Sequence, residues 1–231
     1  MFEDRDDAGA RLAERLSAYA GSKTALVLGI PRGGVVVGSG VSRRLGLPLD
    51  VFISLKLRAP GNEELAVGAM TELGNVYIEQ DLMRRLGMSL ERLGDEFHRE
   101  RQEIEWRRLL YRGGRDLPEV AGRDVILVDD GLATGCTMLA AAEALRPRKP
   151  RRLIAAVPVA PADKFEALEA CFDETVVLKT PVAFDAVGAF YRDFWPVPDA
   201  VVLERLSSRA GKSGKRRQPA AVRGTRPSPG S

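Results

Sequence analysis

The chain has 231 residues, of which 45% are hydrophobic and 29% are charged, so composition indicates a folded globular protein and excludes a wholly disordered one. The sequence contains no run of 18 apolar residues, which excludes a membrane-spanning helix, and its acidic start does not resemble a secretory signal. Two cysteines and one histidine support neither a disulfide framework nor a histidine-rich metal site, so we expect a cytoplasmic protein.

The formal net charge of +3 combines two parts of opposite charge. From Ser208 onward there are 7 basic residues and no acidic ones, which leaves 28 basic and 32 acidic residues in positions 1–207. We therefore predict a single, mildly acidic domain over residues 1–207 and a basic, disordered tail over residues 208–231. The tail is either simply solvated or docks onto RNA or another polyanion.

Apolar runs of strand length alternate with helical patterns along the body of the chain. The predicted strands cover residues 24–30, 49–55, 124–128, 152–159 and 174–178, and the predicted helices include residues 35–45 and 138–145. Continuous apolar strands separated by helices indicate an α/β fold, with an open, mainly parallel sheet covered by helices on both faces.

Two segments depart from this alternation. Residues 66–70 and 75–78 flank Leu73-Gly74 and predict a small hairpin attached to the main sheet. Within a charged insertion at residues 81–115, one or two helices are expected, and they could form a contact between subunits of a homo-oligomer. His98 lies there with no second histidine or nearby cysteine, so we interpret it as a surface or packing residue.

The most informative motif follows the strand at residues 124–128. Asp129 and Asp130 end this strand, and a loop of small and hydroxyl residues leads from them into the next helix. Ligands of open parallel sheets bind beyond the carboxyl ends of the strands, and backbone N–H groups at a helix start suit a phosphate. The carboxylates suit sugar hydroxyls or a divalent cation. The spacing thus predicts a phosphorylated-sugar site, whereas the alternative is a tight turn with exposed aspartates. Neither a P-loop nor a Rossmann fingerprint is present.

Residues 125–137 closely resemble the phosphoribosyl pyrophosphate binding motif of the type I phosphoribosyltransferases. Weaker similarity extends over residues 24–203 and includes Pro31-Arg32-Gly33-Gly34 and Gly188-Ala189-Phe190-Tyr191. The resemblance implies that Asp129 and Asp130 hold the ribose hydroxyls and that the following loop binds the 5-phosphate. The residues of this loop are Gly131, Leu132, Ala133, Thr134, Gly135, Cys136 and Thr137. Arg32, Gly33 and Gly34 would form the pyrophosphate loop, although alone they are equally consistent with a simple strand-to-helix turn.

The segment at residues 56–64 is expected to be a mobile lid over the pyrophosphate. In this family such a loop follows the second core strand and carries a catalytic basic residue, which makes Lys56 and Arg58 candidates beside Asp129 and Asp130. The alternative is a solvated basic loop.

Five aromatic residues gather in a candidate hood at residues 181–200, namely Phe184, Phe190, Tyr191, Phe194 and Trp195. We predict that Phe190 and Tyr191 contact the acceptor by stacking, the alternative being that the rings cap the sheet as core. Purine-salvage members of the family often have an aspartate at the position of Ala133, so the alanine disfavours a 6-oxopurine acceptor.

The resemblance implies transfer of ribose 5-phosphate from phosphoribosyl pyrophosphate to a nitrogen nucleophile, such as a nucleobase-like heterocycle, with release of pyrophosphate. Mg²⁺ would be held mainly through the substrate, without a dedicated protein metal site. A different hypothesis is a non-catalytic sensor that binds phosphoribosyl pyrophosphate or a nucleotide and regulates a partner or RNA. A hydrolase or isomerase would need an acid–base pair, which the sequence does not indicate.

Overall fold

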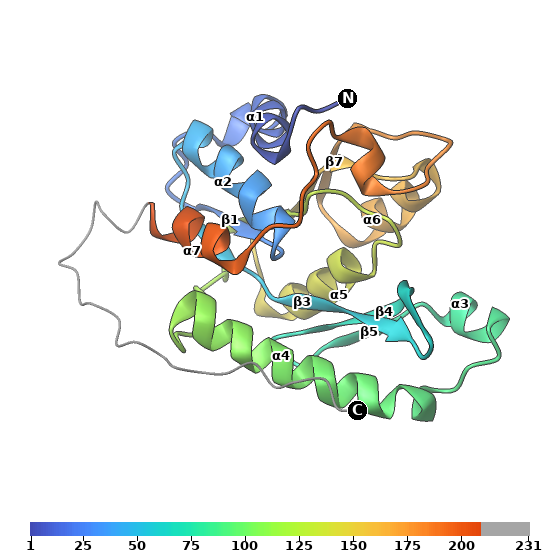
Figure 1. Ribbon diagram of the computed structural model, residues 1–231. Coiled ribbons are helices and arrows are strands. Elements are labelled where there is room, and N and C mark those ends of the chain that lie inside the picture. The colour runs from blue at the N-terminus through green and yellow to red at the C-terminus, as the bar shows by residue number, and fades with distance from the viewer. Residues whose placement is uncertain (209–231) are drawn as a thin grey trace.

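The computed structural model describes residues 1–208, and a five-stranded parallel sheet lies at its centre (Figure 1). In spatial order its strands are β2 (Leu49–Val51), β1 (Ala25–Gly29), β6 (Asp124–Val128), β7 (Arg152–Val159) and β8 (Glu174–Lys179). The predicted α/β class and the predicted parallel sheet are confirmed. Apart from Ser208, the predicted basic tail lies outside the described residues.

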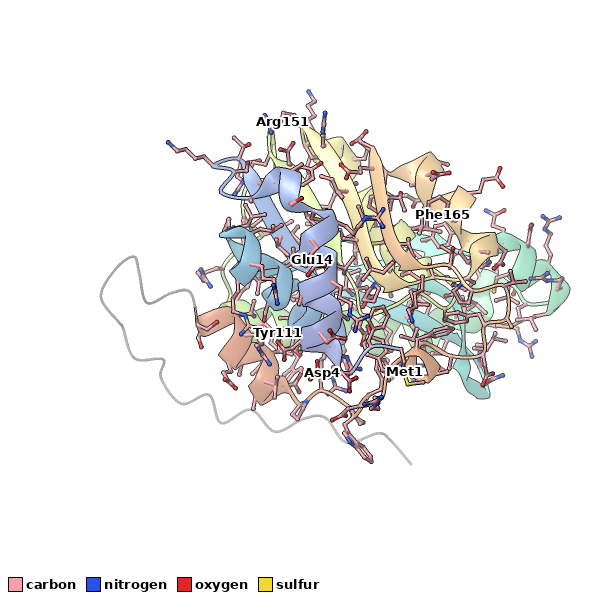
Figure 2. All side chains as sticks on the ribbon, turned by 90° about the horizontal axis from the view of Figure 1, so that it is seen from above. Met1, Asp4, Glu14, Tyr111, Arg151 and Phe165 are labelled. Atoms are coloured by element: carbon pink, nitrogen blue, oxygen red, sulfur yellow. The ribbon has the colours of Figure 1, made fainter. Side chains whose placement is uncertain are left out.

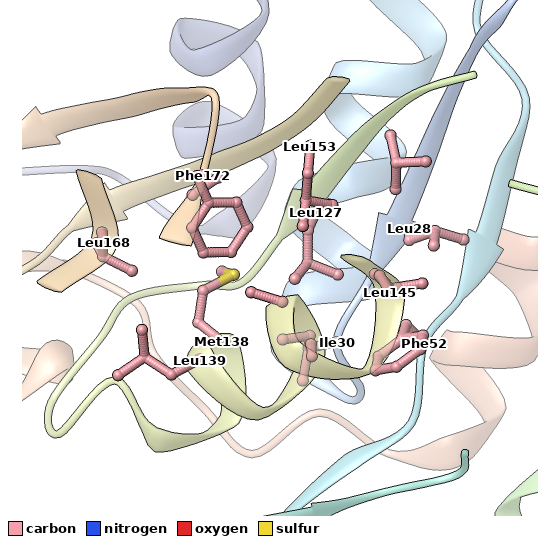
Figure 3. Packing of buried hydrophobic residues seen from close by; sticks show 14 of the residues in the cluster. Leu28, Ile30, Phe52, Leu127, Met138, Leu139, Leu145, Leu153, Leu168 and Phe172 are labelled. Carbon is pink, nitrogen blue, oxygen red and sulfur yellow. The ribbon is translucent and has the colours of Figure 1, made fainter. Parts of the chain in front are cut away.

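Helices pack on both faces of this sheet. On one face lie α1 (Arg5–Arg15) and α2 (Gly33–Leu45), whose apolar side chains form one core cluster with alternate residues of the strands. On the other lie α5 (Cys136–Leu145) and α6 (Phe165–Cys171), which enclose a second cluster that includes Leu127, Met138 and Phe172 (Figure 3). Because every central strand is buried on both faces, its sequence is continuously apolar rather than alternating.

A second, antiparallel sheet contains β3 (Ser54–Ala59), β4 (Asn62–Thr71) and β5 (Val76–Ile78). Helix α5 packs against both sheets, which explains why nearly all of its residues are buried. The predicted hairpin is therefore the second half of a larger three-stranded unit. Short side chains such as Ala140 suit this helix, since Ala69 of β4 packs directly against it.

The prediction of one strand at residues 49–55 was wrong, because this segment is divided between β2 in the main sheet and β3 in the small one. The segment at residues 56–64, which is expected to be a mobile lid, lies in the β3–β4 hairpin. Leu55, Leu57 and Ala59 are buried and alternate with Lys56 and Arg58, which is the period of a strand with one covered face. Sparse apolar content and the Pro-Gly pair obscured this alternation.

The charged insertion contains α3 (Gln80–Arg85), a 3₁₀ turn (Leu90–Leu93) and the long helix α4 (Gly94–Arg112). Helix α4 runs along the small sheet, and α7 (Asp199–Ser207) packs against α2 and α4 (Figure 1). Arg112 at the end of α4 forms an ion pair with Glu72, and the two side chains are only 1% and 2% exposed. The remaining 3₁₀ turns cover Ser17–Tyr19, Arg146–Arg148, Ala162–Lys164 and Val187–Phe190. Within residues 1–208, no helix has both the length and the apolarity needed to cross a membrane.

Candidate functional site

A large cavity opens where the order of the strands reverses. From the central β1 the chain passes to β2 on one side, and later returns to β6 on the other side. The loops after β1 and β6 diverge at this point, which is where open α/β sheets bind ligands. The cavity has a volume of about 1080 Å³, and Arg32, Gly33, Asp129, Asp130 and the loop after them line it.

Two helices begin at this cavity, each directly after one of these strands. Helix α2 starts at Gly33 and α5 starts at Cys136, and the first backbone N–H groups of a helix have no partner within it. Gly135, which precedes α5, has φ +80°, a conformation that costs glycine little and other residues much. The turn before α5 also contains Thr134, and Thr137 follows in the first turn of the helix. The N-termini of α2 and α5, both positively polarised, therefore face the same cavity.

The two loops lie so close together that only glycine fits between them. A Cβ atom on Gly33 would lie 1.8 Å from Asp130 Oδ2, and one on Gly34 would lie 2.5 Å from the carbonyl oxygen of Val128. The segment at residues 31–34, which includes a cis peptide bond between Pro31 and Arg32, thus lies against the acidic pair. The structure brings together the two motifs that were separated by almost a hundred residues in sequence.

The carboxyl groups of the pair have different surroundings. Asp129 Oδ1 accepts a hydrogen bond from the backbone N–H of Asp130 at 2.8 Å. Burial, reinforced by the neighbouring charge of Asp130, raises the pKa of Asp129 well above its usual range. The Asp130 carboxylate instead forms an ion pair with Arg5 of α1, at 2.7 Å between Oδ2 and Nε. Both acids line the cavity and offer oxygen acceptors to a bound hydroxyl.

The basic residues of the sequence prediction all line the cavity but differ in their partners. Arg58 Nη1 donates to Glu100 Oε1 of α4 at 3.2 Å, and Arg32 Nη1 lies 3.9 Å from Asp199 Oδ2. Lys56 is exposed and has no ion-pair partner within residues 1–208. Lys56 is therefore the candidate cation whose charge is least compensated by the protein.

One face of α4 forms a wall of this cavity, which the sequence did not indicate. Glu96 and Ile104 are buried toward the small sheet, and Glu100 is buried at the edge of the cavity. His98, Gln102 and Trp106 line the cavity from more exposed positions. These latter residues recur at four-residue spacing and so share one helix face. The His98 ring lies 3.0 Å from the Gln102 amide nitrogen. His98 is exposed, which agrees with its interpretation as a surface residue, and the surface that it occupies is the wall of this cavity.

The aromatic residues of the hood differ in their surroundings, and Trp195 is 77% exposed outside the cavity. Tyr191 is 5% exposed, packs on Phe2, and donates its hydroxyl hydrogen to the carbonyl oxygen of Asp130 at 2.6 Å. Phe190 stacks on Phe184. Neither Phe190 nor Tyr191 lines the cavity, whereas Phe194 does. Cys136 and Gly34 also lie behind the cavity surface, and burial raises the pKa of the Cys136 thiol.

Two further site residues come from parts of the chain that carried no motif. Arg5 belongs to α1, a helix that was not predicted from the sequence. Trp106 lies in α4, whose charged composition suggested a solvated surface. The four-residue spacing of His98, Gln102 and Trp106 is a signal for a shared face, but it does not indicate what that face contacts. Arg5 had no such signal.

Residues 3–191 match the family model described as phosphoribosyl transferase domain. A protein of Mycobacterium tuberculosis, provisionally named a phosphoribosyl transferase, is 38% identical over 206 residues, which are 89% of this chain and 46% of that protein. The chain thus spans about half the length of the curated relatives it matches. The solved structure of a protein from Thermus thermophilus is 44% identical, with a TM-score of 0.72, and the match covers 90% of this chain and 98% of that one.

Proposed function

Because the chain belongs to the phosphoribosyl transferase family, we propose that it transfers ribose 5-phosphate from phosphoribosyl pyrophosphate to a nitrogen nucleophile and releases pyrophosphate. The observation that carries this proposal is the convergence of two helix N-termini on one acidic pair. A donor with a phosphate at one end, a pyrophosphate at the other and hydroxyls between them has the complementary chemistry.

In this proposal each part of the donor has its own place. The 5-phosphate lies at the start of α5, where backbone N–H groups and the hydroxyls of Thr134 and Thr137 donate hydrogen bonds. The ribose hydroxyls donate to Asp129 and Asp130. The pyrophosphate lies at the start of α2, over the loop at residues 32–34. The acidic pair lies between the start of α2 and the start of α5, just as the ribose lies between the two phosphate groups of the donor.

The reaction breaks the bond between the anomeric carbon of the ribose and the pyrophosphate oxygen, and forms one from that carbon to the acceptor nitrogen. Positive charge develops on the ring and negative charge on the leaving group, so fixed charges on each side lower the barrier. Asp129 and Asp130 orient and stabilise the sugar. Lys56, with Arg32, offsets the charge of the departing pyrophosphate, while Arg58 contributes less because Glu100 compensates it.

Mg²⁺ fits this site as an ion carried by the substrate. Within residues 1–208 no three acidic, histidine or cysteine side chains gather as a ligand set, whereas a pyrophosphate and ribose hydroxyls supply hard oxygen ligands. When bound, the ion would neutralise charge on the leaving group, and Asp129 and Asp130 are the protein carboxylates nearest to the sugar.

The acceptor is proposed to lie against α4. Trp106 and Phe194 are the aromatic residues that line the cavity, and Gln102 and His98 add hydrogen-bonding groups on the same wall. Aromatic faces stack on planar heterocycles, with about 1–3 kcal/mol per base. This assignment replaces the predicted roles of Phe190 and Tyr191, whose positions behind the cavity suit support of the hood.

Oligomeric state and compartment stay predictions from the sequence. From the sequence, the charged helices at residues 81–115 are expected to form a contact between subunits of a homo-oligomer. Light scattering of the full chain at several concentrations tests the contact.

Calorimetric titration of phosphoribosyl pyrophosphate with Mg²⁺ tests the donor site. We expect saturable binding that Asp130→Asn weakens at least tenfold, about 1.4 kcal/mol, while the exposed control Asp185→Asn leaves it unchanged. Absence of binding to the folded wild type would contradict the proposal.

A second measurement separates a transferase from a sensor. Lys56→Ala is expected to abolish pyrophosphate release in the presence of candidate heterocycles while keeping most of the donor affinity. Unchanged pyrophosphate release in this variant would remove Lys56 from the mechanism. Donor binding by the wild type without pyrophosphate release, with any acceptor, would favour the sensor.

A further inference from the structure

Three separate contacts hold the Arg5 side chain, one with the candidate donor site and two with the hood. Its Nε donates to Asp130 Oδ2 at 2.7 Å, and its Nη1 donates to the carbonyl oxygen of Trp195 at 3.0 Å. Its guanidinium lies over Phe194, with Cζ 3.8 Å from the ring centroid. The Arg5 and Asp130 side chains are only 11% and 17% exposed, so solvent screens their attraction weakly.

The fold fixes the segment that carries Arg5. Phe2 is 1% exposed, forms a β-bridge with Tyr191, and donates its backbone N–H to the carbonyl oxygen of Phe190 at 2.8 Å. Asp4 caps α1 by accepting from the N–H of Asp7. Figure 2, in which Met1 and Asp4 are labelled, shows the first residues beside the C-terminal segment.

The same hood segment also holds the backbone of Asp130. The Tyr191 hydroxyl donates to the carbonyl oxygen of Asp130, so the side chain of Asp130 is held by Arg5 and its backbone by Tyr191. Oδ1 of Asp130 receives no hydrogen bond from a nitrogen donor within residues 1–208. Arg5 therefore donates to one carboxylate oxygen of Asp130, and Oδ1 keeps its acceptor capacity for a ligand.

We propose that Arg5 is a positioning residue of the donor site, which fixes the Asp130 carboxylate so that its second oxygen can accept a ribose hydroxyl. This inference rests on the proposed function. The charge of Arg5 also offsets one negative charge beside a substrate that is itself a polyanion. Preorganisation of this kind reduces the ordering that substrate binding must otherwise supply.

The opposite role for the same contact is a latch, in which Arg5 occupies the sugar site and leaves when the substrate arrives. Release would give up the Trp195 hydrogen bond and the interaction with Phe194 as well as the ion pair. The three anchors therefore favour a residue that stays in place. The two roles predict opposite changes in affinity when Arg5 is truncated.

Binding measurements on Arg5→Ala and Arg5→Lys test the proposal. Arg5→Ala is expected to weaken phosphoribosyl pyrophosphate binding at least tenfold, and Arg5→Lys less, because lysine keeps the charge but loses the planar fork. Arg43→Ala is the matched control, since Arg43 forms a 2.7 Å ion pair with Asp6 of the same helix as Arg5. We expect it to change the affinity less than twofold. Equal or tighter binding by Arg5→Ala would overturn the proposal.

Inorganic pyrophosphate with Mg²⁺ is the probe that distinguishes positioning from general damage. Its binding at residues 32–34 should weaken less than that of phosphoribosyl pyrophosphate in Arg5→Ala, because pyrophosphate also loses the nearby charge of Arg5 but has no ribose hydroxyl for Asp130 to hold. Equal losses for both probes would show that Arg5 acts only through its charge or by supporting the fold, which contradicts a positioning role.

Crystal structures of the ligand-free wild type and Arg5→Ala decide the inference separately from the proposed function. We expect the Asp130 carboxylate to occupy several rotamers in the variant, and a single unchanged rotamer would overturn the inference. This comparison holds even if the wild type binds no phosphoribosyl pyrophosphate, a result that would contradict only the proposed function.

Discussion

Asp129 and Asp130 are neighbours in the chain but differ in what compensates their charge. Asp130 pairs with Arg5, whereas Asp129 lies between buried strand ends and receives one backbone hydrogen bond. Burial and the adjacent carboxylate raise the pKa of Asp129, so ionising it costs free energy in the folded state. This cost is characteristic of residues kept for binding or catalysis rather than for stability.

Asp129→Asn is therefore expected to stabilise the ligand-free protein in a pH-dependent way. An acid whose pKa is raised on folding is protonated in both states at low pH, and destabilises the folded state as pH rises above the unfolded pKa of about 3.9. The gain in Tm should thus be small near pH 4 and grow toward neutral pH, by about 2–4 °C for each kcal/mol in a domain of this size. Thermal scans over this range, with Asp185→Asn as control, check it, and a pH-independent difference would contradict it.

Gly33→Ala would add a side chain where the loop after β1 lies closest to the Asp130 carboxylate. The added Cβ would meet Asp130 Oδ2 at 1.8 Å and Arg5 Nε at 2.8 Å, so the carboxylate must leave its position. Because the displaced atoms belong to side chains, we expect the variant to fold but to lose at least tenfold in phosphoribosyl pyrophosphate affinity.

Gly38→Ala in the same helix is the control, since its Cβ would meet nothing nearer than 3.4 Å. Calorimetry and a thermal scan on both variants provide the comparison. Wild-type affinity in Gly33→Ala would mean that the Asp130 carboxylate need not stay where it is.

Helix α4 is the element that links the small sheet to the cavity. One face carries Glu96 and Ile104 onto the sheet, and the neighbouring face lines the site. Glu100 lies buried between the two, where it pairs with Arg58. The buried Arg112–Glu72 pair ties the end of this helix to the loop after β4, where Glu72 also accepts the N–H of Ile53 at 2.9 Å. The position of the proposed acceptor wall depends on this attachment.

Arg112→Met is expected to destabilise the protein by about 3–5 kcal/mol, because it leaves the buried Glu72 carboxylate without its cation. Adding Glu72→Gln removes the unpaired charge and keeps an acceptor for Ile53, so the double variant should recover at least half of the loss. Denaturant unfolding of the wild type, the two single variants and the double variant measures the coupling. Additive losses would show that the two charges do not depend on each other.

At the scale of the whole molecule, the charge is divided between the described body and the segment that follows it. Positions 1–208 have a formal charge of −4, and the residues after them add seven positive charges. The cavity, its two helix ends and the hood all belong to the described part of the chain. Binding of the donor should therefore depend on the described body, and any attraction to polyanions on the segment after it, so that removing this segment should affect only the second.

Deletion of residues 209–231 is expected to leave phosphoribosyl pyrophosphate affinity unchanged while it weakens binding to single-stranded poly(U) RNA. A plot of log affinity against log salt concentration has a negative slope. For every RNA phosphate that the shortened chain no longer neutralises, the magnitude of this slope should decrease by about 0.7. Fluorescence anisotropy at several salt concentrations measures this slope. Equal slopes for the two proteins would exclude the tail as an RNA-binding segment.

Features that depend on contiguous residues could be predicted from the amino-acid sequence alone. Apolar strands with flanking helices indicated the parallel sheet, and residues 125–137 contain a strand, an acidic pair and the loop proposed to bind phosphate without interruption. The β3–β4 hairpin was not predicted from the sequence. The apolar residues that alternate with Lys56 and Arg58 are few, so the segment is also compatible with a basic loop.

The distant segments that complete the candidate site could be identified only from the packing of the folded chain. Arg5, Trp106 and Phe194 come from three separate parts of the chain, and each meets the cavity because of how its element packs. Phe190 and Tyr191 show the converse, since their aromatic character suited a ligand but packing with Phe2 and Phe184 places them behind the wall. Local pattern specifies strands, helices and turns, because their periods are set by the backbone. The partners of an exposed charge or ring depend on long-range packing, which no local period encodes.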